Sequence, residues 1–309
     1  MSSDILGDFD NIVKRFKSTE ALSNLSFKLH KGINGLVGPN GAGKTTAIKL
    51  SLGLIKADAG KAEMFGFDCW TGSLEIRRRV GVLFEKVAFY DHLSGLDHLQ
   101  LMAKIKGVPD PLGASKAVLK LVELENEAQH RRIGSYSAGM RQRIGLAHAL
   151  LGTPELVILD EPTSNLDPLG RAHVLEMVNK LKKEGFSFLI SSHILPELER
   201  VCDHVILMNR GKAVRQGTLT QLLSEVASSE AFNIKVQPIG SIAELLKQEK
   251  SVKEIAILED HLLVIAKNAD LFKQRLPLIV AQANASLEEV KVVGTDLESL
   301  FKVAVKGGA

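Results

Sequence analysis

Apolar segments and helical spacing alternate along the first part of the chain and predict buried strands and helices. Residues 33–37 form a short, mostly apolar segment, and residues 156–159 form an unbroken apolar run. Such a run is typical of a parallel strand that is buried on both faces of a sheet. After the first segment, Ile48, Leu52 and Ile55 recur at i, i+4 and i+7, which predicts a helix. The pattern therefore predicts an α/β fold.

Beyond residue 226 the pattern changes. Residues 226–231, VASSEA, are small and polar and predict a linker. Pro277 lies within a later helical segment, so that helix is expected to start there or to be kinked. The order strand, helix, two strands, helix, strand predicts a small ferredoxin-like α+β domain. The expected elements span residues 232–236, 242–248, 254–258, 261–266, 271–283 and 288–293.

Composition limits the class of protein. The 309 residues are 45% hydrophobic and 24% charged, enough for one large domain or for a large and a small one. The sequence shows neither a bilayer-spanning apolar run nor a signal-peptide pattern at its start, so we expect a cytoplasmic protein. The net charge of +3 is too balanced to indicate nucleic acid as the main partner. Cys69 and Cys202 lack metal or redox spacing and are predicted to be buried free thiols.

A glycine-rich stretch suggests the chemistry. Residues Gly38 to Thr45 match G-x-x-x-x-G-K-[ST] between the strand 33–37 and the expected helix. Glycines let several backbone N–H groups converge on an anion at a helix N-terminus. Lys44 is expected to reach the β- and γ-phosphates, Thr45 to bind Mg²⁺ and Thr46 to add a phosphate donor. The predicted ATP-binding residues of the loop are Gly38, Pro39, Asn40, Gly41, Ala42, Gly43, Lys44, Thr45 and Thr46.

Two carboxylates follow the apolar run 156–159. They are Asp160 and Glu161, and ligands of open α/β sheets lie beyond such strand ends. Asp160 is expected to hold Mg²⁺ through its water shell. Glu161 is expected to polarise a water for attack on the γ-phosphate. Together with the glycine loop, these residues predict an ATP hydrolase with the cofactors ATP and Mg²⁺.

In this order the motifs resemble those of ATP-binding cassette (ABC) ATPases, the motor subunits of ABC transporters. The family's signature, usually L-S-G-G-Q, resembles YSAGM at residues 136–140. The resemblance implies that Ser137, Ala138 and Gly139 bind in trans the γ-phosphate of an ATP held by a second copy. Met140 replaces the family's glutamine, which serves the ribose side. Apolar positions recur behind the signature at helical spacing and predict that it begins a helix.

Two further stretches resemble family motifs. Residues 164–167, SNLD, resemble the loop that touches the opposite subunit, so Asp167 is expected to contact ATP in trans. Because Pro168 follows, Asp167 is also a candidate helix cap. The apolar residues 188–190 predict a strand that leads to His193, which resembles the switch histidine of the family. We therefore expect Glu161 and His193 to be the catalytic pair.

The resemblance assigns two residues more weakly. Glu85 takes the position of the family's Q-loop glutamine and is expected to ligate Mg²⁺; a solvated loop glutamate is the alternative. Phe16 takes the position of a ring that stacks on adenine, and packing in the core is the alternative.

The resemblance also implies the organisation and the partners. Residues 1–227 are expected to form the nucleotide-binding domain, with a mostly helical insert at about 86–152, and residues 228–309 an accessory domain. Residues 295–305 resemble the closing helix of exporter-type cassette proteins, or form a plain amphipathic helix. Two copies would dimerise head to tail around two ATP molecules. They would drive export by a separate transmembrane permease, which docks near residues 85–90, from the inner face of the cell membrane.

Two other functions would require different sequence features. An ABC ATPase of DNA maintenance or translation would need long heptad arms, zinc-binding cysteines or two cassettes in one chain, and the sequence has none of these. A regulatory subunit that only binds nucleotide would not need Glu161. The sequence therefore favours a transporter ATPase.

Overall fold

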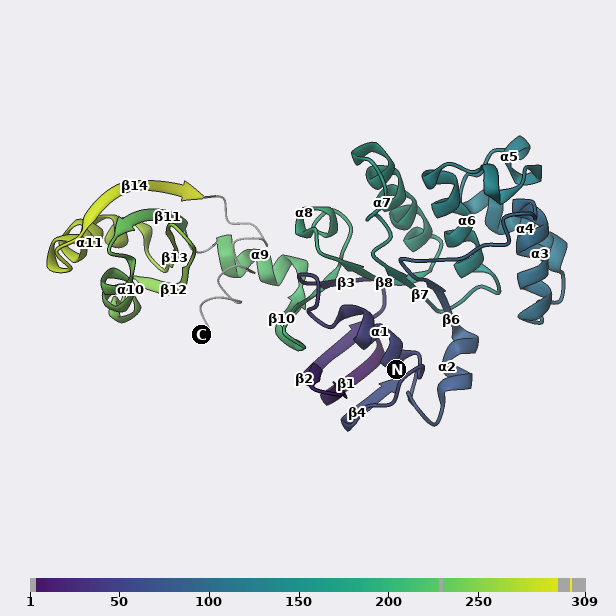
Figure 1. Cartoon of the computed structure of the whole chain (residues 1–309), viewed down its shortest axis with the longest axis horizontal. Coiled ribbons are helices and arrows are strands. Elements are labelled where there is room, and N and C mark those ends of the chain that lie inside the picture. The colour runs from purple at the N-terminus through teal and green to yellow at the C-terminus, as the bar shows by residue number, and fades with distance from the viewer. Residues whose placement is uncertain (1–3, 228–229, 294–300, 302–309) are drawn as a thin grey trace. The chain divides into compact units, whose positions relative to one another are not determined.

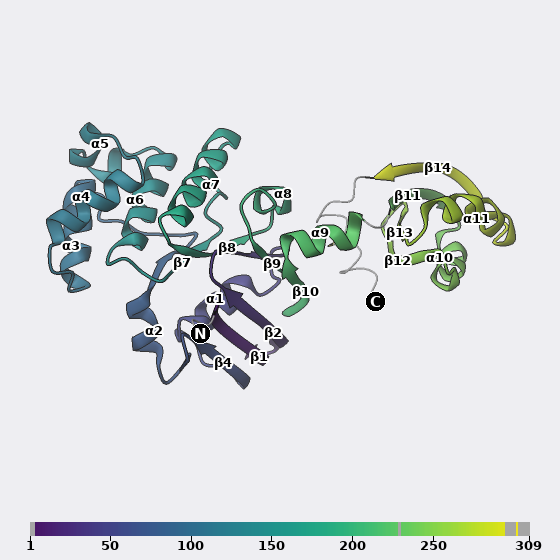
Figure 2. The same cartoon turned by 180° about the vertical axis from the view of Figure 1, so that it is seen from behind.

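The computed structural model describes residues 4–227, 230–293 and 301. The chain divides into two compact units, Met1–Ala213 and Val214–Ala309, which are described one at a time (Figures 1 and 2).

Parallel strands form the centre of the first unit, in the order β9-β3-β8-β7-β6. Every residue of β3, β7 and β8 is buried, as expected for strands covered on both faces. All three strands predicted here are confirmed. The five strands are β3 (Ile33–Val37), β6 (Val80–Leu83), β7 (Leu156–Asp160), β8 (Ser187–Ser192) and β9 (His204–Asn209).

A hairpin completes this sheet. β10 (Lys212–Thr218) is the neighbour of β9 in the sheet. Arg210 and Gly211, which connect the two strands, both have positive φ angles. The two strands therefore flank a tight turn at residues 210–211. The division between the compact units falls inside β10. The domain boundary expected between residues 227 and 228 stays a proposal that rests on the change in sequence pattern.

A second, antiparallel sheet was not predicted. Its order is β2-β1-β4-β5, and its apolar side shares one core with Ile48 of α1 (Lys44–Ser51). The helix α1 ends earlier than its apolar pattern, because Gly53 has a φ of +63° and a Cβ there would collide with the backbone oxygen of Cys69. The expectation of helix as far as Ile55 is wrong. The strands are β1 (Ile5–Phe16), β2 (Thr19–His30), β4 (Ala59–Met64) and β5 (Phe67–Asp68).

The insert is helical, as predicted. Figure 1 shows its helices gathered beyond β6, at the end of the sheet opposite β9. They are α3 (Gly95–Ile105), α4 (Pro111–Leu121), α5 (Asn126–His130), the short η1 (Ile133–Ser135) and α6 (Ala138–Leu150). The remaining helices of the unit are α2 (Ser73–Arg79), before β6, α7 (Pro168–Lys183), after β7, and α8 (Leu195–Leu198), after β8.

Two expectations about the class of protein are met. Cys69 and Cys202 are buried and free, and burial raises the pKa of the Cys69 thiol to about 12. None of the helices in the described part of the chain has the length and apolarity that crossing a bilayer requires.

The second unit has the predicted ferredoxin-like topology. After α9 (Leu219–Ala227), its antiparallel sheet has the order β12-β13-β11-β14. One apolar core joins that sheet to its two helices, with Phe232 and Phe272 in contact at 4.9 Å between ring centroids. The elements are β11 (Glu230–Gln237), α10 (Ile239–Gln248), β12 (Val252–Ile257), β13 (Leu262–Ala266), α11 (Ala269–Gln282) and β14 (Ser286–Val293).

Details of this unit differ from the sequence predictions. The expected linker 226–231 is wrong in extent, because α9 runs to Ala227 and β11 begins at Glu230. Small polar residues can lie in helices and strands because the packing of neighbouring apolar residues overrides their weak intrinsic preferences. Pro277 does not start α11, which begins eight residues earlier at Ala269. The closing helix expected at 295–305 lies, apart from Phe301, outside the described residues.

Candidate functional site

The glycine loop joins β3 to α1, and its glycines are required by the backbone. A Cβ at Gly38 would collide with the backbone oxygen of Met208. Gly41 and Gly43 have φ angles of +81° and +101°, a region that side chains disfavour. Gly43 is also the N-cap of α1, so the loop delivers backbone N–H groups to the positive end of a helix. The predicted strand, loop and helix are confirmed in that order.

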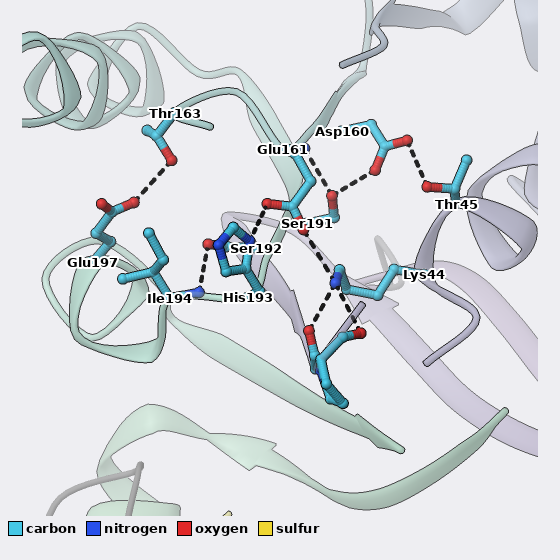
Figure 3. A network of polar contacts seen from close by, with 12 residues as sticks. Lys44, Thr45, Asp160, Glu161, Thr163, Ser191, Ser192, His193, Ile194 and Glu197 are labelled. Atoms are coloured by element: carbon cyan, nitrogen blue, oxygen red, sulfur yellow. Dashed lines mark hydrogen bonds and ion pairs between the residues drawn. The ribbon is translucent and has the colours of Figure 1, made fainter. Parts of the chain in front are cut away.

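Lys44 points back into this loop. Its Nζ donates to the carbonyl oxygens of Gly38 at 2.7 Å and Pro39 at 3.3 Å. The ammonium also lies 3.1 Å from Oε1 of Glu161, an ion pair whose geometry does not make a hydrogen bond. The side chain is only 6% exposed. A positive charge is therefore held at the mouth of the loop by groups that a phosphate can replace (Figure 3).

A second chain of contacts links Thr45 to Asp160. The hydroxyl of Thr45 donates to Oδ2 of Asp160 at 2.9 Å, and the hydroxyl of Ser191 donates to Oδ1 at 2.6 Å. The oxygen donors fit Mg²⁺, which proteins commonly bind through one or two carboxylates, with substrate phosphates and water completing the shell. Sequence reasoning missed Ser191, although it stands two residues before His193 in SSH.

Glu161 turns away from the strand and meets His193. It follows β7 directly and has a φ of +51°, a strained angle for a non-glycine residue. Its backbone N–H donates to the Ser191 hydroxyl at 2.8 Å. Its Oε2 lies 2.8 Å from Nδ1 of His193, whose side chain is 41% exposed. The two residues expected to be catalytic are therefore in contact, one nearly buried and one open to a ligand.

The signature and the SNLD stretch both begin helices. Ser137 is the N-cap of α6 and accepts from the N–H of Met140 at 3.3 Å. A Cβ at Gly139 would meet nothing within 4 Å, so the helix start has an open surface beside it. Asp167 caps α7 by accepting from the N–H of Gly170 at 2.9 Å, which confirms the predicted cap. Within the described residues, no hydrogen bond or ion pair joins Ser137 or Ala138 to the glycine loop.

The two weaker assignments have different outcomes. Phe16, at the end of β1, is 45% exposed, and the ammonium of Lys14 lies 5.5 Å from its ring centroid. Core packing of Phe16 is therefore wrong, and its ring is open to stacking. Glu85 lies exposed two residues after β6. Its role as a Mg²⁺ ligand stays a prediction beside the alternative of a solvated loop residue.

The known proteins that this chain resembles are named as ATP-binding proteins of transport or resistance. A family model described as ABC transporter matches residues 22–164. The bacitracin transport ATP-binding protein BcrA of Bacillus licheniformis is 33% identical over 96% of this chain and 96% of its own. The linearmycin resistance ATP-binding protein LnrL of Bacillus subtilis is 30% identical over 94% and 96%. The daunorubicin resistance ATP-binding protein DrrA3 of Streptomyces coeruleorubidus is 33% identical over 75% and 74%.

Solved structures agree on the fold. The ATP-binding cassette MJ0796, in a dimeric state with ADP and phosphate, has a TM-score of 0.63 and 22% identity over 69% of this chain and 99% of its own. A solved ATP-binding subunit of an ABC transporter has a TM-score of 0.63 and 28% identity over 72% and 93%. The chain therefore contains the fold of an ATP-binding cassette.

Proposed function

Because the chain belongs to the ATP-binding proteins of ABC transporters and is an ATP hydrolase of that family, we propose that it hydrolyses MgATP to drive export through a separate membrane permease. The observation that carries the proposal is the meeting of Lys44, Asp160 and Glu161 at one edge of the parallel sheet. Buried charges are costly even when they are paired, and clusters of them are typical of functional sites.

Binding is the work of the loop and its neighbours. The backbone N–H groups of residues 38–46 hold the phosphates, and Lys44 exchanges its loop carbonyls for the β- and γ-phosphate oxygens. Thr45 and Asp160 hold Mg²⁺, with Glu85 as a further ligand. The metal, when bound, neutralises part of the charge on these phosphates. The exposed ring of Phe16 stacks on adenine.

Hydrolysis needs a positioned water. Glu161 holds and polarises that water with its carboxylate, whose orientation is set by Lys44 on one oxygen and His193 on the other. On ATP binding, the half-exposed His193 contacts the γ-phosphate and so senses its presence.

A second copy completes each site. Ser137, Ala138 and Gly139 of one copy donate to the γ-phosphate held by the other, and Asp167 lies at the same junction. The exposed helix start at Ser137 and the open space beside Gly139 support this arrangement. Opening of the dimer after hydrolysis would then move the attached permease.

The relatives' names support the proposed direction of transport. Proteins matching nearly the whole chain are named for bacitracin transport and linearmycin resistance. By this similarity, the chain works at the inner face of the cell membrane, and its permease exports an antibiotic-like compound. A groove near residues 85–90 receives the permease.

Gene deletion tests the proposal. Cells that lack the gene should become more sensitive to bacitracin, linearmycin or daunorubicin, and the wild-type gene should restore resistance. The gene for Glu161→Gln should not restore it, because that protein binds MgATP without turnover. Unchanged sensitivity to all three compounds would count against export.

A further inference from the structure

A nearly buried carboxylate lies beside the site without belonging to any motif predicted above. Glu197, in α8, is four residues after His193, and its side chain is 15% exposed. Its Oε2 accepts a hydrogen bond from the hydroxyl of Thr163 at 2.8 Å. Thr163 is 2% exposed and lies two residues after Glu161 (Figure 3). The carboxylate thus ties the segment that carries His193 to the segment that carries Glu161.

The other oxygen of Glu197 reaches the SNLD stretch. Its Oε1 accepts from the guanidinium of Arg171, in α7, at 3.2 Å. The same guanidinium donates through Nε to the carbonyl oxygen of Leu166 at 2.9 Å. Leu166 belongs to residues 164–167, the stretch expected to face a second copy. The Glu197 carboxylate therefore contacts the segment after Glu161 directly, through Thr163, and residues 164–167 indirectly, through Arg171.

These contacts close a ring with the catalytic pair. Glu161 touches His193 at 2.8 Å, the chain leads from His193 to Glu197, Glu197 binds Thr163, and the chain returns to Glu161. Glu161 holds a strained φ of +51°, which persists only where surrounding contacts over-determine it. The ring supplies such a contact on the side away from Lys44.

We propose that Glu197 is a positioning residue for hydrolysis: it holds Glu161 and His193 in register and transmits the position of residues 164–167 to them. The inference rests on the proposed function, because it gives Glu197 a role in the proposed ATP hydrolysis. It places Glu197 outside nucleotide binding, since its hydrogen-bond partners, Thr163 and Arg171, are not residues of the glycine loop.

Turnover and binding measured on the full chain test this inference. Glu197→Ala should lower kcat by about tenfold to a hundredfold, because small misplacements of catalytic groups have effects of that size. KM and the Kd for MgATP should stay within about twofold, and each value of kcat is expressed per bound nucleotide, so that loss of folded protein is not counted. Glu176→Ala, an exposed glutamate on the same helix as Arg171, is the control and should match the wild type.

A double-mutant cycle separates positioning from general weakening. Thr163→Val keeps the shape of the side chain and removes the donated hydrogen bond, so it should lower kcat in the same way. The variant that combines Glu197→Ala with Thr163→Val should be no slower than Glu197→Ala, since both changes cut one contact. If Glu197→Ala fails to fold, Thr163→Val and Arg171→Met decide, and each should lower kcat at least about fivefold.

The failures are distinguishable. A wild-type chain that does not hydrolyse MgATP would overturn the proposed function and this inference with it. A wild-type chain with normal turnover, beside a Glu197→Ala chain with kcat within about twofold of it, would overturn the inference alone. The inference would also be overturned if the fold-loss of kcat in the double variant equalled the product of the losses in Glu197→Ala and Thr163→Val. Such a product would show that the two side chains act independently.

Discussion

The two units differ in how deeply they bury charged side chains. In the first unit, Lys44, Asp160 and Glu161 are at most 10% exposed and lie within one group of contacts. In the second unit, among the described residues, the buried polar side chain is Ser251, and ion pairs such as Lys235–Asp260 lie at the surface. Burying charge costs free energy that packing alone does not return.

The difference indicates where the chemistry lies. The core of the second unit is apolar, and its most buried carboxylate among the described residues, Glu249, is paired with Arg275. The sheet edge of the first unit keeps a nearly buried cluster of charges, which is typical of a functional site. The hypothesis is therefore that the first unit catalyses and the second serves another purpose, and each prediction below tests that contrast.

The largest effect is expected at Glu161. Glu161→Gln should lower turnover of MgATP by about a hundredfold to a thousandfold, because glutamine keeps the shape but cannot accept a proton or hold water as a carboxylate does. Binding of MgATP should persist. Phosphate release and a nucleotide titration measure the two quantities, and near-normal release would remove Glu161 from its role.

Lys44 should instead affect binding. Lys44→Ala removes a nearly buried charge that we propose to contact the phosphates, so the Kd for MgATP should rise about tenfold to a hundredfold. The matched control is Lys49→Ala, an exposed lysine of the same helix, which should bind as the wild type does. Equal affinities of Lys44→Ala and wild type in a calorimetric titration would contradict the role of the loop.

The sequence predicted the residues that stand at the ends of buried strands. An apolar run followed directly by Asp160 and Glu161, or closely by His193, indicates both a buried strand and the candidate site residues at its end. The ferredoxin-like unit was equally accessible, because its elements alternate with clear apolar periods. Both depend on local pattern, which a single sequence contains.

What the sequence did not predict depends on residues far apart in the chain. The helix α1 ends before its apolar pattern does because Gly53 packs against Cys69. Ser191 and Glu197 bind polar partners about thirty residues away, and local pattern does not show which distant side chains meet. The strands β1, β2 and β4 alternate buried apolar and exposed polar positions over parts of their length, so no unbroken apolar run marked their sheet.

Acid should weaken the first unit more than the second. His148, in α6, has its pKa lowered to about 4 by burial and by the nearby charges of His98 and Lys106. Burial also lowers the pKa of His98, whose ring lies 5.5 Å from that of His148. Below the unfolded pKa of about 6.5, the unfolded chain binds more protons than the folded one. Stability should therefore be complete above pH 6.5 and fall as the pH drops toward 4, by up to about 3 kcal/mol for His148.

Urea unfolding at pH 7.5 and pH 5 measures this loss. The single tryptophan, Trp70, lies in the first unit, so its fluorescence reports that unit alone. His148→Leu should remove most of the pH dependence. A midpoint that does not shift between the two pH values in the wild type would show that the burial of His148 is relieved in solution.

The smallest effect on catalysis is expected from the core of the second unit. Phe272→Ala removes a fully buried ring that packs on Phe232 and should destabilise this unit by about 3 to 5 kcal/mol. Hydrogen exchange in α11 and β13 should accelerate, while turnover of MgATP stays within about twofold. The matched change, Phe188→Ala, opens an equally buried site near the start of β8, the strand that leads to His193, and should abolish turnover. If Phe272→Ala also abolished turnover, the second unit would be part of the catalytic machinery, and the contrast between the two units would fail.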